Sequence, residues 1–166
     1  ILRWMDEVEK VTAQSYSLLA TAYYQIDDFI KARDSMLEAV RLAEEVEEYR
    51  PKENWYVLLA ACYAELLDAK KMTKQESLEK RLEIYEILVN YYPKKQYFLQ
   101  LGGVYSQMDR EVDYMITLKA AYMKDLLDKE SEYMALAQLL LLNKNPYWAA
   151  QVIVDGQEKQ VLVKDE

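Results

Sequence analysis

Histidine is absent from this sequence, and cysteine, glycine and proline are scarce. Without histidine, the chain contains no Ser-His-Asp triad, no His-Glu-x-x-His zinc motif and no imidazole for acid–base catalysis. A phosphate-binding loop is missing too, because Gly102-Gly103 lacks the flanking glycines and the Lys-Ser/Thr pair that such loops carry. We therefore expect a non-enzymatic protein with no catalytic residues, no cofactor and no metal.

Only three glycines and three prolines interrupt the 166 residues, of which 52% are hydrophobic. So few helix breakers predict a chain that is helical throughout, with enough apolar material for a core. The single cysteine, Cys62, cannot form an internal disulfide, and its place beside Tyr63 predicts a buried, inert thiol. Cysteine usage therefore leaves the cellular compartment open.

Positive charge is also in short supply, since 21 Lys and Arg stand against 29 Asp and Glu, for a net charge of -8. Such a surface repels phosphate backbones, so we expect no binding to nucleic acid. There is no basic amphipathic face, and the apolar run 139–142 is too short to cross a bilayer, so we expect no membrane insertion. The acidic run 44–48 spreads around an expected helix, as a solvated surface does.

What the sequence does contain is a repeated phrase of an aromatic residue, a Leu, a small residue and a Tyr, at positions i, i+3, i+4 and i+7. This spacing defines one face of a helix, so each phrase predicts the packing face of a first helix that precedes a second one. The last phrase replaces the closing Tyr with Leu. The phrases are Tyr16-Leu19-Ala20-Tyr23, Tyr56-Leu59-Ala60-Tyr63, Phe98-Leu101-Gly102-Tyr105 and Tyr133-Leu136-Ala137-Leu140.

Small residues in both helices of a pair would let the two backbones approach closely. Ala32 follows Tyr16 by 16 positions, and the same step from Tyr133 reaches Ala149, whereas the step from Phe98 reaches Tyr114 and breaks the rule. Asp27-Asp28 predicts a turn whose Asp caps the next helix. In the first pair the face of that second helix is expected to be Phe29, Ala32, Met36 and Ala39.

Two segments are longer than the pattern requires. Between Leu66 and Leu82 lie extra residues rich in Lys and Gln, which predict a lengthened hairpin loop with Thr73 or Ser77 capping the helix after it. After the first phrase, the second helix is expected to continue through Glu48 towards Pro51.

The phrase recurs after 40, 42 and 35 residues, and it resembles the tetratricopeptide repeat, whose period is roughly 34 residues; the resemblance covers nearly the whole chain. It implies an all-α, right-handed superhelical solenoid of antiparallel helix pairs, with about four repeats in 13–162. Residues 1–12 are expected to be the remnant of a preceding repeat helix and 163–166 a truncated tail, and the apolar edges at both ends offer a route to self-association. The expected repeats lie near 13–50, 53–93, 95–128 and 130–162.

In the tetratricopeptide architecture the first helices line a concave groove, and helical phase predicts which residues face it. These residues include no Lys or Arg, so the groove lacks the clamp with which some tetratricopeptide domains bind the C-terminal carboxylate of a chaperone. We expect a neutral, partly apolar groove that binds a helical or extended protein segment. The expected groove residues are Gln14, Ser17, Thr21, Tyr24, Asn54, Val57, Ala61, Leu99, Gly103, Ser106, Met134, Gln138 and Leu141.

A narrower resemblance concerns proteobacterial tetratricopeptide proteins whose genes sit beside TonB–ExbB–ExbD systems. The runs that are similar are SYSLLATAYY at 15–24, PKENWY at 51–56, and the stretch from KESE at 129–132 through PY at 146–147. This resemblance implies a periplasmic interaction protein, accessory to TonB-dependent transport. The alternative is a structural segment of a longer solenoid, whose groove is filled by its own chain.

Overall fold

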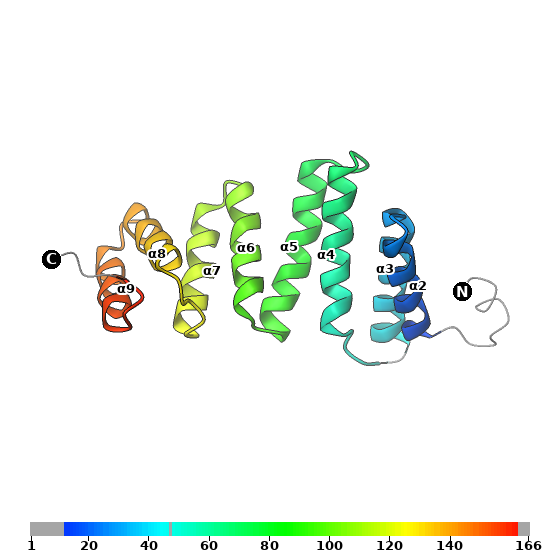
Figure 1. Ribbon diagram of the computed structural model, residues 1–166, viewed down its shortest axis with the longest axis horizontal. Helices are drawn as coiled ribbons and strands as arrows, with labels where there is room; N and C mark the ends of the chain where they lie inside the picture. Colours follow the sequence, from blue (N-terminus) through cyan, green and yellow to red (C-terminus); the bar gives the residue numbers. More distant parts are fainter. Residues whose placement is uncertain (1–11, 47, 163–166) are drawn as a thin grey trace. The chain divides into compact units, whose positions relative to one another are not determined.

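The computed structural model describes residues 12–46 and 48–162, which form eight α-helices and no strand (Figure 1). The prediction of an all-α chain is therefore confirmed. The chain divides into two compact units, one up to Leu88 and one from Val89, with the boundary inside α5 (Lys74–Tyr91). Apart from Thr12, the predicted remnant helix at 1–12 falls outside the described residues, as does the predicted tail at 163–166.

In the first unit, α2 (Ala13–Gln25) packs on α3 (Phe29–Glu45), and α3 packs on α4 (Glu53–Asp68). Thr12 caps α2, because its hydroxyl accepts the N–H of Ser15. Asp28 caps α3 by accepting the N–H of Lys31, which confirms the cap predicted at the Asp27-Asp28 turn. Such caps stabilise a helix by about 1 kcal/mol, so these residue choices help fix where α2 and α3 begin.

The long segment after Leu66 is helical, so the predicted loop is wrong. α4 continues to Asp68 and α5 begins at Lys74, which leaves only the turn 69–73 between them. Thr73 and Glu76 form a capping box, in which the side chain of each accepts the backbone N–H of the other. Ser77 does not cap; it is fully buried and donates its hydroxyl to the carbonyl of Tyr63. The cap and this buried contact stabilise the extra helical turns.

α3 ends at Glu45, before the predicted end near Pro51. Val46 is its C-cap, and Glu48 has a φ of 53°, in the left-handed region, where a right-handed helix cannot continue. Glu44 is exposed at the end of this helix, and its carboxylate accepts the hydroxyl of Tyr56 at 3.1 Å.

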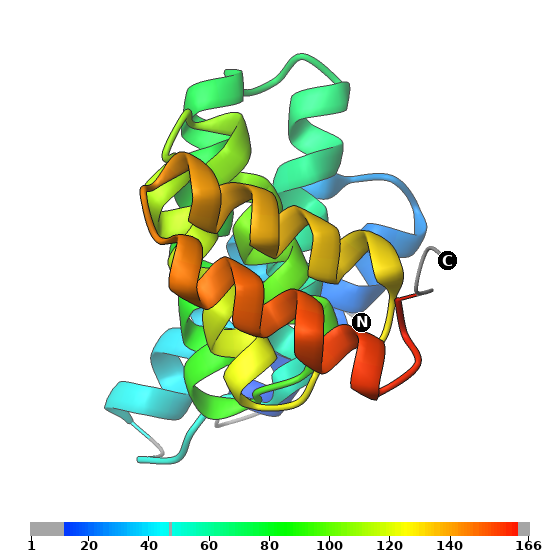
Figure 2. The same ribbon diagram turned by 90° about the vertical axis from the view of Figure 1, so that its left-hand side faces the viewer.

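In the second unit, α6 (Lys95–Gln107) packs on α7 (Glu111–Met123), and α8 (Glu130–Leu142) packs on α9 (Pro146–Glu158). α7 also contacts α8. Figure 2 shows α8 and α9 side by side, in orange and red. Pro146 occupies the first turn of α9, where its missing N–H costs no hydrogen bond.

The C-terminal ends of six helices, α2, α4 and α6 to α9, share one backbone geometry that is built without glycine. The residue after the C-cap has a φ between 56° and 60°, and it and the next residue donate their N–H groups back to the last turn of the helix. This is the Schellman motif, which usually places glycine at the left-handed position. A residue with a Cβ is disfavoured there by roughly 1–2 kcal/mol. The residues that take this position are Asp27, Lys70, Asp109, Asp125, Lys144 and Gln160.

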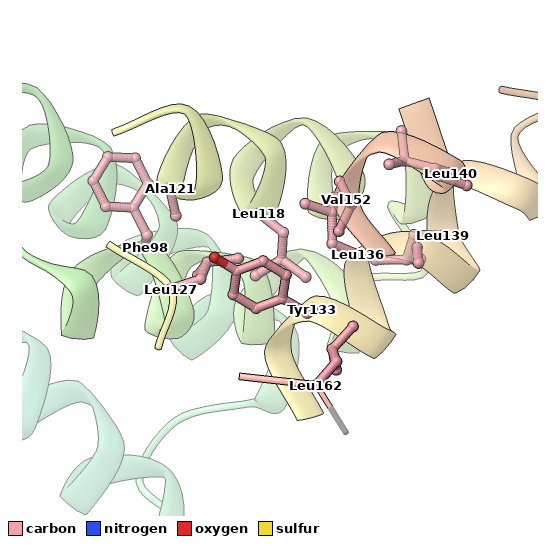
Figure 3. Close-up of a cluster of buried hydrophobic side chains, with 12 residues drawn as sticks. Phe98, Leu118, Ala121, Leu127, Tyr133, Leu136, Leu139, Leu140, Val152 and Leu162 are labelled. Carbon is pink, nitrogen blue, oxygen red and sulfur yellow. The ribbon is translucent and has the colours of Figure 1, made fainter. Parts of the chain in front are cut away.

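The repeated phrase forms the packing face of its helices. All four phrase residues of α4, α6 and α8 are buried, whereas in α2 the two tyrosines, Tyr16 and Tyr23, are only half-buried. Figure 3 shows the cluster of the second unit, where Tyr133 of α8 lies with Phe98 of α6 and Leu118 of α7. The core prediction is thus confirmed for most phrase positions.

Tyr114, which breaks the small-residue rule, packs against Gly102. A Cβ on Gly102 would come within 2.8 Å of two carbons of the Tyr114 ring, a distance that atoms in contact do not tolerate. The α8–α9 pair instead has Ala137 and Ala149 at the matching positions, and both are buried. The missing side chain on α6 therefore makes room for the large one on α7.

Cys62 is a free cysteine with no exposed surface, as predicted. Its burial in α4 raises the pKa of the thiol to about 12. Since the thiolate is the reactive form of cysteine, this side chain is inert at neutral pH and serves packing.

Candidate interaction surface

In the first unit, the groove prediction is wrong for Ser17. Only 4% of this side chain is exposed, and its hydroxyl donates to the carbonyl of Gln14. Ser17 shares its phase on α2 with the buried Ala13 and Ala20, so it belongs to the packing face rather than to a solvent-facing one. The other predicted groove residues of this unit are exposed or half-buried: Gln14, Thr21, Tyr24, Asn54, Val57 and Ala61.

Two polar contacts connect α2 with α4 and the segment just before it. Lys52 Nζ donates to Gln14 Oε1 at 2.9 Å, and the Tyr24 hydroxyl donates to Glu65 Oε1 at 3.4 Å. Burial, followed by the charge of Glu65, raises the pKa of Tyr24 and keeps its hydroxyl protonated as the donor. Helical phase does not identify Lys52, because it precedes α4, yet its ammonium contacts Gln14, one of the predicted groove residues.

In the second unit, an uncharged strip of α8 reaches solvent. Met134 and Leu141 are 40% and 57% exposed, and Gln138 between them is exposed as well. The three residues follow one another at i, i+4 and i+7, so they form one continuous face, which we call the α8 strip. An amphipathic segment could lay apolar side chains along a face of this kind.

The predicted groove residues of α6 are an apolar side chain that packs on the core, a glycine with open space around it and an exposed serine. Leu99 is half-buried and packs against the core cluster. A Cβ on Gly103 would meet no atom within 4 Å, so the backbone of α6 is accessible there. Ser106, one turn further along, is exposed. None of the three residues carries a charge.

An ion pair anchors the beginning of α6 to the beginning of α8. Lys95 Nζ lies 2.8 Å from Glu132 Oε1, and it also pairs with Asp128. Glu132 is only 8% exposed, and its Oε2 accepts the backbone N–H groups of Asp128 and Lys129. These partners satisfy a nearly buried carboxylate, which would otherwise be costly to desolvate.

A pocket of about 350 Å³ opens beside the turn 108–110, next to the end of α6. Tyr114, Leu139 and Leu142 give it aromatic and aliphatic walls. Its volume lies near the lower limit for ligand pockets, so it has room for one or two amino-acid side chains rather than for a large organic ligand. The polar part of the lining is Ser106, Asp109 and Glu111.

Two carboxylates make the rim of this pocket anionic. Glu111 Oε1 accepts an N–H of Asn143 at 3.3 Å, and neither Glu111 nor Asp109 forms an ion pair with another described residue. Arg110, which stands between them in sequence, is held elsewhere. Its Nε donates to Asp113 at 2.8 Å, and its guanidinium lies 4.6 Å from the centre of the Tyr105 ring.

The structure also exposes an apolar strip on α7 that sequence reasoning missed. Val112, Ile116 and Met123 are 53%, 55% and 63% exposed. Lys119, on the same helix, places its ammonium 3.8 Å from the centre of the Trp148 ring, a cation–π contact with α9. Because α7 carries apolar residues on nearly every side, periodicity alone could not separate its outer face from its inner one.

Across 12–46 and 48–162, no group of three His, Cys, Asp or Glu side chains is placed to hold a metal ion. None of the helices described combines the length and the apolar character needed to cross a membrane. A scan against protein-family models finds no match to the chain, and a comparison with curated proteins finds no significant relative.

Proposed function

We propose that this chain is a non-enzymatic interaction scaffold of the tetratricopeptide type, whose helix pairs stack as a right-handed solenoid. Its role is to bind a segment of another protein. The observation that carries the proposal is the α8 strip, because Met134 and Leu141 remain exposed on a helix whose opposite face is fully packed. Exposed apolar residues gathered on one face mark interaction sites more often than scattered ones do.

The geometry of the surface favours a helical or extended partner segment. The spacing of the α8 strip matches the i, i+4 and i+7 anchors through which helices meet, and the open space at Gly103 on α6 has room for a partner's backbone. Met134 adds an adaptable side chain of the kind found at surfaces that bind varied segments.

The similarity to tetratricopeptide proteins encoded beside TonB–ExbB–ExbD systems supports a more specific assignment. On this proposal the protein acts in the periplasm as an accessory of TonB-dependent transport. Identification of the bound partner by mass spectrometry tests it, since recovery of a component of that machinery supports the assignment and recovery of unrelated partners alone removes it.

The test of the scaffold is capture of partners from a native extract by the wild-type protein and by two double variants. Met134→Glu/Leu141→Glu places charge on the α8 strip. Val112→Glu/Ile116→Glu makes the same change on the exposed strip of α7 and serves as the matched control. Leu99 is left unchanged, because it packs against the core and its replacement would also disturb folding.

We expect a partner that the wild type and the α7 variant retain and that the α8 variant loses. Equal retention by all three proteins contradicts binding at the α8 strip. A complete lack of partners favours the alternative, in which this face packs against further parts of a longer solenoid.

A further inference from the structure

We propose that the pocket lined by Ser106, Asp109, Glu111, Tyr114, Leu139 and Leu142 receives a basic side chain of the partner segment, with arginine favoured over lysine. The inference rests on the proposed scaffold function and names the chemistry that the partner must present. A segment lying on the α8 strip would reach the pocket through Leu139 and Leu142, which belong to the last turn of the same helix.

The aromatic wall of the pocket depends on a local departure from the repeat. Tyr114 occupies the position at which the first and last helix pairs have Ala32 and Ala149. Its ring is accommodated only because Gly102 has no Cβ, which would otherwise lie 2.8 Å away. The same residue that breaks the small-residue rule therefore supplies an aromatic ring to the pocket lining, and tyrosine rings attract cations.

Charge complementarity points to a cation as the occupant. Asp109 and Glu111 contribute two carboxylates and the lining contains no basic residue. Arg110 is not available to neutralise them, since it is engaged by Asp113 and by the ring of Tyr105. With a net charge of -8, the whole chain also attracts basic segments during encounter.

The shape of the lining favours arginine. Leu139 and Leu142 offer aliphatic surface for the methylene groups that long basic side chains bury behind a solvated charge. A guanidinium can stack on Tyr114 and donate two parallel hydrogen bonds to one carboxylate, whereas an ammonium offers a point charge without either feature.

The test is an NMR titration of the isotopically labelled protein with N-acetyl-arginine amide, N-acetyl-lysine amide and N-acetyl-citrulline amide. Citrulline has nearly the shape of arginine but carries no charge, so it separates charge recognition from apolar contact. We expect the arginine probe to shift the signals of Tyr114, Leu139 and Leu142, the lysine probe to do so more weakly and the citrulline probe not to do so. Equal shifts with citrulline overturn the proposal, as does the absence of shifts with arginine.

The double variant Asp109→Asn/Glu111→Gln removes the charge of the rim while keeping side-chain shape, and Asn tolerates the left-handed backbone of position 109. Glu130→Gln, in the first turn of α8 and outside the pocket, is the matched control. The rim variant should bind the arginine probe several-fold more weakly than the wild type, and the control should bind it equally. Undiminished binding by a folded rim variant contradicts the proposal, and the citrulline comparison on the wild type decides the matter if the variant does not fold.

The outcome is separable from that of the scaffold proposal. If the α8 strip captures a partner but the arginine probe leaves the pocket unperturbed, only the inference about the basic side chain fails. If the pocket binds arginine but no partner depends on the α8 strip, the scaffold proposal fails instead.

Discussion

The α6–α7 and α8–α9 pairs of the second unit pack closely at matching positions, but they do so with different residues. In α8–α9, the close approach is made by Ala137 and Ala149, which are both buried. In α6–α7, the first helix has Gly102, which has no side chain, and the ring of Tyr114 on the second helix fills the space beside it. One pair therefore combines a glycine with a large side chain, whereas the other has a small side chain on both helices.

This redistribution has a consequence beyond packing. The ring of Tyr114 forms a wall of the pocket beside the turn 108–110. An alanine there, as at Ala149 in the neighbouring pair, would lack the aromatic surface. A deviation from the repeat pattern can therefore shape a surface pocket, and here the pocket also has an anionic rim formed by Asp109 and Glu111.

The largest expected effect concerns the leucines that the two pairs share. Leu101→Ala and Leu136→Ala each remove a buried side chain at the same phrase position and should each lower the free energy of unfolding by about 2–5 kcal/mol. Urea unfolding followed by circular dichroism measures the loss, with the exposed Gln100→Ala as the control. A leucine variant that unfolds like the wild type would show that the phrase does not form the core.

The next effect tests the difference between the pairs directly. Gly102→Ala should destabilise the wild type by about 1–3 kcal/mol, because the new methyl group overlaps the Tyr114 ring. In a Tyr114→Ala background the same change should stabilise by up to about 1 kcal/mol, because alanine favours the helix more than glycine does. A double-mutant cycle of unfolding free energies measures this reversal. If Gly102→Ala changed the unfolding free energy in the same direction in both backgrounds, the Tyr114 ring would not be what requires glycine at position 102.

A smaller effect is expected at the turns of the two pairs. Lys144 and Asp109 both lie in the left-handed region, with φ of 56°. Lys144→Gly should raise the free energy of unfolding by about 0.5–1 kcal/mol, the relief of strain being partly offset by the greater freedom of glycine in the unfolded chain. Asp109→Gly should raise the free energy of unfolding by less, because Asp tolerates the left-handed region better than Lys does. Thermal unfolding ranks the two, and a larger gain at position 109 would contradict the argument.

The smallest effect concerns the anchor between α6 and α8. A hydrogen bond from Lys95 lowers the pKa of the Asp128 carboxyl. A lowered pKa means that the stabilising contribution is complete above the ordinary pKa of aspartate and disappears as the pH falls through the lowered value. Asp128→Asn should therefore be less stable than the wild type at neutral pH and equally stable in strong acid. A stability difference that does not change with pH would assign the effect to something other than this charge.

The sequence predicted the helices and most of the core, because both follow from local spacing. The i, i+3, i+4, i+7 phrase identifies residues such as Leu136, and the Asp28 cap follows from turn chemistry. The prediction of a lengthened loop is wrong because the residues between Leu66 and Leu82 count as an insertion when the chain is matched to the repeat. Thr73 and Glu76 nevertheless carry a helix-start signal.

The surface was harder to predict than the core. Helical phase predicts Ser17 in the groove, yet Ser17 also shares its phase with Ala13 and Ala20, so only tertiary packing decides which side of the helix is covered. Lys52 lies outside a helix, where phase has no meaning. The pocket has one sequence signal, the unexpected Tyr114, but its aliphatic walls, Leu139 and Leu142, come from α8 and depend on how α8 lies against α7.

Binding at the α8 strip is tested most directly by photo-crosslinking in a native extract from a benzoylphenylalanine placed at Gln138, in the middle of the strip. The same residue placed at Gln151, an exposed position of α9, is the control. We expect a defined crosslinked partner from position 138 that is absent from position 151 and lost when Met134→Glu/Leu141→Glu is introduced. Equal crosslinking from both positions, or none from position 138, would contradict binding at the α8 strip.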